Sequence, residues 1–214
     1  MNLAEGSRSW IFIPLICIIL FGLGCLFLAN ILQIIFVFFF FLAVLIEGFF
    51  LIFFRDPERS IGNDLVAVAD GKIQFIDEIN DKDIGESIRI ATFMNVHNVH
   101  VNRMPIDGII KKITHIPGGY LPAFKKESER NERVVTLVES PVGTIKIIQI
   151  AGTLAKRIIW YVKKGQEVKK GQRFGMIKLG SRVDIIIPKE LKEGISVSIG
   201  DRVLAGVDTI CKLP

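Results

Sequence analysis

The sequence predicts a mainly β domain preceded by a transmembrane helical hairpin. Between Trp10 and Phe54 the only charged side chain is Glu47, and most of the other residues are Ile, Leu, Phe and Val. The rest of the chain consists of short β-branched runs separated by Gly, Pro, Asn and Asp. Long apolar segments span membranes, and short runs bounded by turn residues are typical of antiparallel strands. We therefore expect a hairpin over residues 1–54 and a β domain over residues 55–214.

The apolar segment is long enough for two membrane passes. As one helix it would measure roughly 68 Å at about 1.5 Å per residue, against a hydrocarbon core of about 30 Å. We place the passes at IFIPLICIILFGLGCLFLA and IIFVFFFFLAVLIEGFFLIFF, with Asn30 and Gln33 at the polar tip between them. A cleavable signal peptide is the alternative, but a basic start, a short apolar region and an A-x-A site are not found here.

Basic residues flank the hairpin at both ends. Arg8 precedes the first pass, and Arg55 and Arg59 follow the second. Both ends of a hairpin lie on one side of the membrane, and the positive-inside rule makes that side cytoplasmic. The sequence therefore predicts a protein of the cell membrane whose C-terminal domain is cytoplasmic. Glu47 lies near the end of the second pass, where we interpret it as reaching the interface or a polar partner.

Charge and cysteine content limit the possible partners. The chain carries a net charge of +5, and its first 54 residues carry −1, which leaves +6 for the β domain. A basic domain beside a membrane is attracted to anionic headgroups. Nucleic acid is not expected as a partner, because no recognition helix, aromatic RNP-like stretch or Arg-rich tract is seen. The three cysteines have no CxxC or Cys–His zinc spacing, so we expect no metal site and a reducing cytosol.

The β domain contains an internal repeat. The segments GQEVKKG and GDRVLAG begin at Gly165 and Gly200, and both read G-[QD]-x-V-x-x-G. We expect each glycine to occupy a turn that requires positive φ, and Val168 and Val203 to pack inward. This rhythm resembles the flattened β-sandwich of biotinyl and lipoyl carrier domains, which predicts a β-sandwich-like architecture. The stretch ESPVGTIKI additionally predicts a β-hairpin.

Polar residues at the ends of β segments are candidates for a site. His97 and His100 lie in FMNVHNVHVNRMP. Asp70 follows an apolar run in VAVADGKI, and Ser181 follows a glycine in GMIKLGSRVD. Each alone has a structural interpretation, as a core histidine or a turn residue, and His115 is interpreted as a structural loop residue. Histidines at i, i+3 point to opposite faces of a strand and meet only in a turn. An Asp, a His pair and a Ser from separate segments can nevertheless converge into an activated serine.

Together these segments resemble the short, pyruvoyl-dependent phosphatidylserine decarboxylase family. The matching pieces cover essentially the whole chain in order: FFRDPER, VADG, FMNVHNVHVNR, IPGGY, NER, QIAGTLAKRI and GQRFGMIKLGSRVD. Longer members of the family carry Gly-Ser-Thr at a cleavage point, and Arg182 replaces that threonine here, which suits the short subfamily. Archaeal members of this subfamily are inferred to act on archaetidylserine, so an ester or an ether lipid backbone is left open.

The resemblance implies that the chain cleaves itself between Gly180 and Ser181. Ser181 would attack the carbonyl of Gly180, and elimination with loss of ammonia would leave a pyruvoyl group on the new N-terminus. This covalent pyruvoyl group, derived from Ser181, would be the cofactor. The products, residues 1–180 and residues 181–214, would stay together as a heterodimer of the two fragments.

The resemblance also implies the reaction and its catalytic residues. His100, oriented by Asp70, would be the base that activates Ser181. The pyruvoyl group would form a Schiff base with the amine of a serine phospholipid and withdraw electrons while carbon dioxide departs. The product would be the ethanolamine phospholipid. His97 would guide the carboxylate or reprotonate the α-carbon.

Two other functions remain open from the residues alone. One is a membrane-tethered biotinyl- or lipoyl-like binding module, because Lys178 in MIKLG is similar to a biotin-acceptor lysine. In such modules the acceptor precedes the V-x-x-G-x-x-V-x-x-G stretch, whereas Lys178 follows it. The other is a membrane peptidase or esterase that uses Asp70, His100 and Ser181. Ser181 lacks the G-x-S-x-G surroundings of a nucleophile elbow, which disfavours an α/β-hydrolase.

Overall fold

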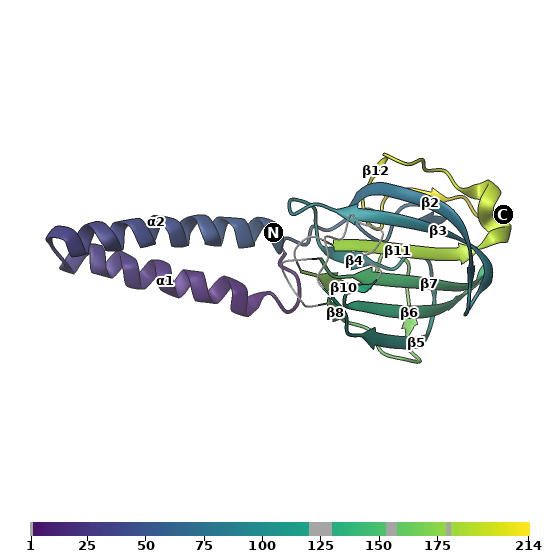
Figure 1. Ribbon diagram of the computed structural model, residues 1–214, viewed down its shortest axis with the longest axis horizontal. Coiled ribbons are helices and arrows are strands. Elements are labelled where there is room, and N and C mark those ends of the chain that lie inside the picture. Colours follow the sequence, from purple (N-terminus) through teal and green to yellow (C-terminus); the bar gives the residue numbers. More distant parts are fainter. Residues whose placement is uncertain (1, 120–129, 153–157, 179–180) are drawn as a thin grey trace. The chain divides into compact units, whose positions relative to one another are not determined.

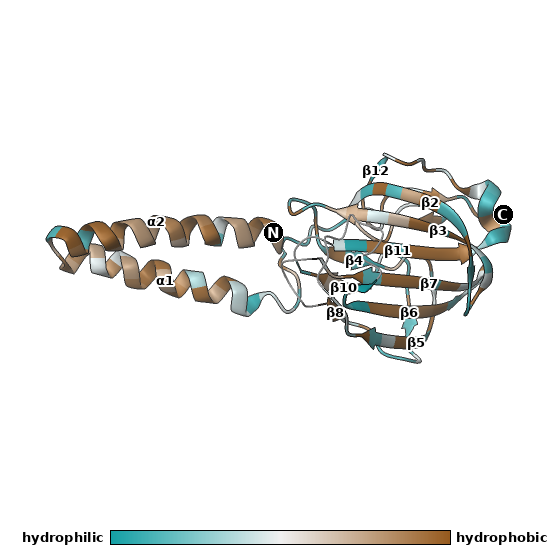
Figure 2. Ribbon diagram, in the orientation of Figure 1, coloured by the Kyte–Doolittle hydropathy of each residue, from teal (hydrophilic) through white to brown (hydrophobic). Residues whose placement is uncertain are grey.

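The computed structural model describes residues 2–119, 130–152, 158–178 and 181–214. The chain divides into two compact units, Met1–Pro57 and Glu58–Pro214. The first unit is a pair of helices, α1 (Arg8–Phe27) and α2 (Asn30–Phe53), that run antiparallel in Figure 1. Both are long and apolar enough to cross a membrane, and Figure 2 shows hydrophobic residues along almost their whole length. The two predicted apolar helices are confirmed, and they suggest membrane association.

The turn between the helices lies where the sequence predicts a polar tip. Asn30 has a φ of +58°, a left-handed conformation that asparagine tolerates. The Gln33 side chain donates a hydrogen bond of 3.0 Å to the carbonyl of Cys25 across the turn. Gly24 lets the helices approach closely, because a Cβ there would lie 1.9 Å from the ring of Phe36. Beyond the turn, aromatic rings of the two helices contact one another.

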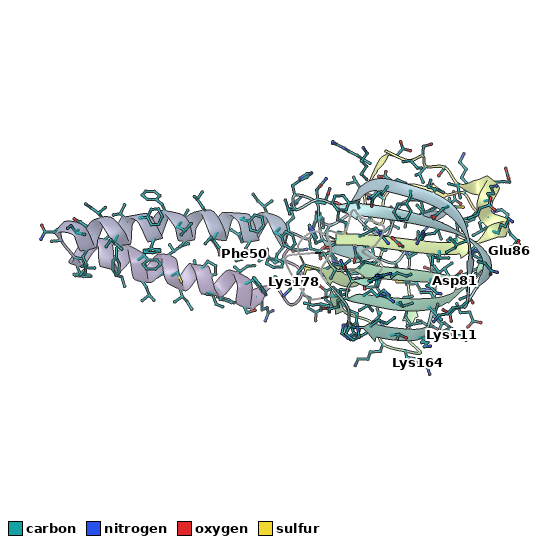
Figure 3. All side chains as sticks on the ribbon, viewed as in Figure 1. Phe50, Asp81, Glu86, Lys111, Lys164 and Lys178 are labelled. Carbon is teal, nitrogen blue, oxygen red and sulfur yellow. The ribbon has the colours of Figure 1, made fainter. Side chains whose placement is uncertain are left out.

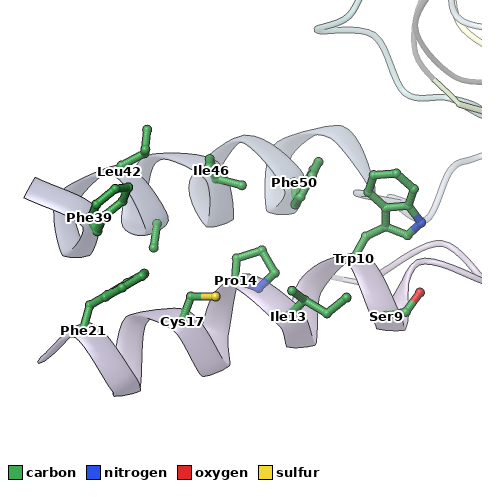
Figure 4. A pocket seen from close by; sticks show the side chains of 11 residues that line it. Ser9, Trp10, Ile13, Pro14, Cys17, Phe21, Phe39, Leu42, Ile46 and Phe50 are labelled. Atoms are coloured by element: carbon green, nitrogen blue, oxygen red, sulfur yellow. The ribbon is translucent and has the colours of Figure 1, made fainter. Parts of the chain in front are cut away.

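An apolar groove of about 440 Å³ runs between α1 and α2 (Figure 4). Pro14 and Cys17 lie along it on α1. Trp10 and Phe50 close one end with their ring centroids 5.5 Å apart. Since nearly all of the lining is apolar, this groove is compatible with a lipid environment.

The second unit is an antiparallel β domain. Its strands among the described residues are β1 (Leu65–Val66), β2 (Gly71–Asp81), β3 (Gly85–Met94), β4 (Val101–Arg103), β5 (Gly108–Ile116), β6 (Arg133–Ser140), β7 (Gly143–Ile150), β8 (Ile158–Trp160), β9 (Glu167–Val168), β10 (Arg173–Ile177), β11 (Ser181–Pro188), β12 (Arg202–Val203) and β13 (Thr209–Cys211). A 3-10 helix, Lys189–Gly194, follows β11. The largest sheet has the order β12-β2-β3-β11-β7-β6-β5-β9. The strands β4, β10 and β8 form a second sheet, and β1 pairs with β13.

The mainly β class is confirmed, but the sandwich expected from the repeat is replaced by a different arrangement. The eight strands of the large sheet curl into a half-barrel (Figure 1). Alternate residues of β11, such as Val183 and Ile185, enter the core from its inner face, and Phe174 of the smaller sheet joins the same cluster. A twisted sheet of this many strands curls. One large sheet therefore covers most of the core, instead of two equal layers.

The internal repeat forms the two edges of the large sheet. Val168 lies on β9 and Val203 on β12, and both side chains are buried. The four glycines of the repeat have positive φ angles: +82° and +78° at Gly165 and Gly171, +103° and +76° at Gly200 and Gly206. The predicted turn glycines and inward valines are thus confirmed.

The strand register shows that the two halves of the large sheet are arranged alike, beyond the repeat itself. Val203 pairs with Gly71 and Val168 pairs with Gly108. Each of these two glycines follows an aspartate and begins a long strand, β2 or β5. The next strands inward are β3 and β6, and β11 and β7 meet in the middle. The sheet therefore has a pseudo-twofold axis between β11 and β7.

The two central strands begin at equivalent positions. β7 begins with Gly143 opposite Ser140, the last residue of β6, and the two are joined by the hairpin that ESPVGTIKI predicts. β11 begins with Ser181 opposite Met94, the last residue of β3. The fold thus places Ser181 where the other half of the sheet has a tight hairpin.

Candidate active site

Ser181 is fully buried at the start of a central strand. Its Oγ atom has no hydrogen-bond partner among the described residues. A buried polar atom without a partner destabilises a protein by about 1–3 kcal/mol, so such atoms are rare and call for an explanation. Gly180, the predicted cleavage partner of Ser181, lies outside the described residues, as does Leu179.

His100 is also fully buried, and one of its ring nitrogens has a defined partner. Nδ1 lies 2.8 Å from the backbone carbonyl of Asn98. Because a carbonyl only accepts, Nδ1 carries the proton, and in the neutral ring Nε2 has the free electron pair. The backbone N–H of Ile177 donates to the His100 carbonyl at 3.3 Å. This bond holds the histidine against the segment that leads to Ser181.

His97 lies in a turn and is exposed, unlike His100. The turn follows β3 and is closed by two bonds: the N–H of Asn98 donates to the Asn95 carbonyl at 2.9 Å, and the N–H of Asn95 donates to the Asn98 side chain at 2.8 Å. A turn is the arrangement in which an i, i+3 pair can meet. Here it instead gives the two histidines different environments, one open to solvent and one inside the domain.

Asp70 forms a buried ion pair that was not predicted from the sequence. Arg59 bonds to both carboxylate oxygens, at 2.5 and 2.8 Å, with side chains only 9% and 4% exposed. The N–H of Ala205 donates to Asp70 at 2.8 Å, and the carbonyl of Ala205 accepts from Arg59 at 2.8 Å. His100 has Asn98 as its Nδ1 partner, so the orientation of His100 by Asp70 stays a prediction. No sequence spacing indicates the Arg59 pair, although Arg59 lies in the FFRDPER segment.

Strand register brings the predicted residues to one end of the large sheet. Lys72 pairs with Phe93, so Asp70 lies just beyond the end of β3. Ser181 pairs with Met94 on the other side of β3. Because neighbouring strands are about 4.8 Å apart, β2, which follows Asp70, and β11, which begins with Ser181, are separated by about 10 Å. The turn that contains His97 leaves β3 at this same end and leads to His100. In Figure 3 the label of Lys178 marks this end of the domain, and those of Asp81 and Glu86 lie toward the other.

Two buried amides extend the polar network beside Ser181. The side chain of Gln149 donates to Asn102 at 2.8 Å, and the Asn102 amide lies 3.8 Å from the sulfur of Met94. Met94 is the residue paired with Ser181, so these amides link β4 and β7 to the start of β11. They could not be selected from the sequence, because nothing in the local pattern distinguishes them from surface amides.

His115 lies on strand β5, and its expected position in a loop was wrong. The run GIIKKITHI reads as a strand once its pairing with β6 is known. Nε2 of His115 is 3.1 Å from a carboxylate oxygen of Glu132, and the ring lies 5.9 Å from that of Trp160. These contacts give His115 a structural role. In the part of the chain that the structure describes, no three His, Cys, Asp or Glu residues are grouped to hold a metal ion.

Comparison with known proteins decides the family. The sequence profile described as phosphatidylserine decarboxylase matches residues 46–211. The chain belongs to the phosphatidylserine decarboxylase family. It is 44% identical over 176 residues to the putative archaetidylserine decarboxylase proenzyme of Methanococcoides burtonii, which covers 81% of this chain and 79% of that protein. The corresponding proenzyme of Methanosarcina barkeri is 40% identical over 216 residues, 99% of this chain and 98% of its own. The phosphatidylserine decarboxylase proenzyme of Streptomyces avermitilis is 47% identical over 159 residues, 74% and 71% of the two chains.

The family assigned from the sequence is confirmed. Proenzymes of the phosphatidylserine decarboxylase family make a pyruvoyl group from a serine. Ser181 fits such a group, because its hydroxyl is buried and has no hydrogen-bond partner among the described residues. A serine that is consumed in maturation does not need a lasting partner.

Proposed function

We propose that this protein decarboxylates a serine phospholipid at a membrane and forms its pyruvoyl group from Ser181 by cutting the chain after Gly180. The observation that carries the assignment of Ser181 is its buried hydroxyl, without a hydrogen-bond partner among the described residues, at the start of a central strand. Membership of the phosphatidylserine decarboxylase family supplies the reaction. The other site residues are assigned because strand register brings their segments to the same end of the large sheet as Ser181.

Maturation begins with loss of the proton from the Ser181 hydroxyl. His100 suits the task, because the bond from Nδ1 to Asn98 leaves Nε2 as the basic nitrogen. The Ser181 Oγ bonds to the carbonyl carbon of Gly180 and the peptide C–N bond breaks, which gives an ester and a free amine. Loss of the α-proton then breaks the Cβ–Oγ bond and releases the Gly180 carboxylate. Water replaces the nitrogen of residue 181, which departs as ammonia and leaves the pyruvoyl group.

The two products, residues 1–180 and 181–214, stay associated as a heterodimer. The smaller chain supplies β11, which lies between β3 and β7 in the large sheet. It also supplies β12, paired with β2, and β13, paired with β1. Since the large sheet and the β1–β13 pair each contain strands of both fragments, the ladder hydrogen bonds hold the fragments together.

In the mature enzyme, the pyruvoyl carbonyl supplies an electron sink for the charge that remains when carbon dioxide leaves. His97 serves at the solvent side of the site, where it guides the carboxylate or returns a proton to the α-carbon. Its exposure on the turn beside β3 supports this role. Asp70 with Arg59 provides fixed charges at the same end of the sheet.

The substrate is a phospholipid with a serine headgroup, and the product carries ethanolamine. The names of the relatives include both archaetidylserine and phosphatidylserine decarboxylases, which share this headgroup. The hairpin α1–α2 holds the catalytic domain at the cell membrane. Arg8 and Arg55 at its ends support a cytoplasmic position of that domain.

Cleavage of the purified protein tests this function. On denaturing gels the wild-type chain gives two fragments, and intact mass identifies residues 1–180 and a pyruvoyl-blocked 181–214. Ser181→Ala removes both cleavage and the conversion of serine phospholipid to ethanolamine phospholipid, followed by mass spectrometry of the lipids. Ser140→Ala, at the equivalent end of β6, is the control and leaves both intact. An uncut wild-type chain that is active contradicts the proposal, whereas biotin or lipoate mass on Lys178 would indicate a carrier module.

A further inference from the structure

Arg182, which directly follows Ser181, is held by an unusual set of contacts. Successive strand residues point to opposite faces, so Ser181 shares the core face with Val183, whereas Arg182 lies on the other face. Its side chain is nevertheless fully buried. Nε and Nη2 donate to the two carboxylate oxygens of Asp184 at 2.8 and 3.0 Å. The guanidinium also lies 5.1 Å from the centre of the Phe75 ring.

The ladder around β11 shows why the second residue of the strand matters. Ser181 is paired with β3 alone, through Met94. Arg182 is the first residue paired on both sides, with Phe93 of β3 and Ile150 of β7. After cleavage, residue 181 is a chain end, and chain ends fray unless they are tied down. Arg182 is therefore the first residue that can hold the pyruvoyl-bearing end.

The other half of the sheet provides an internal comparison. At the start of β7, Thr144 occupies the position equivalent to Arg182, and it is half-buried. Lys146 is equivalent to Asp184, but it pairs with Asp81 and Asp83 of the β2–β3 hairpin. The fold thus does not require an ion pair within this strand. The pair is found at the strand start that is cut and not at the one that stays joined to its hairpin.

We propose that Arg182 is a positioning residue that, with Asp184 and Phe75, holds the cut end of the small chain in the active site. This rests on the proposed self-cleavage at Ser181. A buried ion pair adds little stability over apolar residues of similar size, but its bonds are directional. Before the cut, the intact peptide holds Ser181, so the anchor acts after cleavage.

The test separates cleavage from decarboxylation. Arg182→Met/Asp184→Leu removes both charges and leaves neither buried alone. We expect the half-time of self-cleavage to change less than about twofold, and kcat for the serine phospholipid to fall at least tenfold. Amide exchange at residues 182–184 becomes at least tenfold faster in the cleaved variant. In a Ser181→Ala background, which stays uncut, the same two substitutions leave this exchange unchanged.

A matched ion pair on the same sheet is the control. Arg89 bonds to Asp77 at 3.1 and 2.7 Å and also approaches the Phe75 ring, at 5.0 Å, but it lies on β3, away from the cut end. Arg89→Met/Asp77→Leu is expected to keep kcat and the exchange at residues 182–184.

Arg182→Lys keeps the charge but loses the paired donors, and it should show normal cleavage with an intermediate loss of kcat. This milder variant decides the question if the double variant does not fold. Wild-type kcat in the folded Arg182 variants, unchanged exchange after the cut, or loss of cleavage overturns the proposal. An uncut wild-type protein would instead refute the proposed function on which it rests.

Discussion

Asp70 and Asp107 occupy equivalent positions in the two halves of the sheet, and each carboxylate accepts a hydrogen bond from the N–H two residues after the valine of the repeat, at 2.8 and 2.7 Å. Their ionic partners differ. Asp70 is bound by the buried Arg59, whereas Asp107 faces an exposed Lys169 at 3.6 Å. The fold uses an aspartate at both places, but the buried arginine belongs to the half that contains Ser181.

This comparison predicts that Arg59 is needed for self-cleavage as well as for the stability of the fold. Arg59→Met leaves Asp70 buried without its counter-ion, which should lower the free energy of unfolding by about 3–5 kcal/mol and slow self-cleavage at least tenfold. Arg59→Lys should recover part of both. Lys169→Met, in the equivalent pair, should change the unfolding free energy by less than about 1 kcal/mol, because that pair is exposed. Urea unfolding and a gel time course measure the two quantities, and equal behaviour of Arg59→Met and Lys169→Met would contradict the argument.

Substitution of the two histidines should affect different steps, self-cleavage for His100 and decarboxylation for His97. His100→Gln removes the proposed general base, and the loss of a general base slows a reaction by about 10²–10⁴-fold. We expect the chain to remain largely uncut. His97→Gln should cleave at close to the wild-type rate and then show a reduced kcat with the lipid. Intact mass after a fixed time, followed by the lipid assay, distinguishes these outcomes, and normal cleavage of His100→Gln would remove His100 from its proposed role.

Local patterns predicted much of this molecule. The apolar segment fixed two helices, and the spacing of Val168 and Val203 among glycines identified two inward positions before their strands were known. The helices and the valines depend on composition and on neighbours within a few residues, which a single sequence contains. Ser181 was selected through the family resemblance, and its role stays a prediction.

Features that depend on strand register were not predictable in this way. The pair of Arg59 with Asp70 joins a connecting segment to a strand start, and the bond from His100 to Asn98 depends on the shape of a turn. The curled sheet was mistaken for a sandwich, because the repeat specifies turns and inward valines but not which strands lie between them. His115 was placed in a loop for the same reason, since its strand is defined by its partner.

Glycines of the repeat should differ in their tolerance of a side chain. Gly165 has a φ of +82° and open space around it. Gly165→Ala should therefore lower the free energy of unfolding only by the backbone strain of a left-handed alanine, about 1–2 kcal/mol. At Gly206 the φ is +76°, and a Cβ would also lie 2.9 Å from Cδ of Arg103. Arg103 is buried and donates to the carbonyl of Gly171 at 3.1 Å, so it cannot easily move. We expect Gly206→Ala to be at least about 1 kcal/mol less stable than Gly165→Ala in urea unfolding.

Acid stability should depend on a pair far from the site. Lys146 donates to Asp83 at 2.6 Å, and this hydrogen bond, with the lysine charge, lowers the pKa of Asp83. A carboxylate with a lowered folded pKa stabilises the protein fully above its unfolded pKa of about 3.9, and the contribution is lost as the pH falls through the folded pKa. Asp83→Asn should therefore lower the urea midpoint at pH 7, and the difference from wild type should shrink below about pH 4. In a Lys146→Met background the same substitution should have a much weaker pH dependence, because only the charges of Lys82 and Lys112 then lower the pKa of Asp83. A difference that persists at low pH would show that the pair is not its cause.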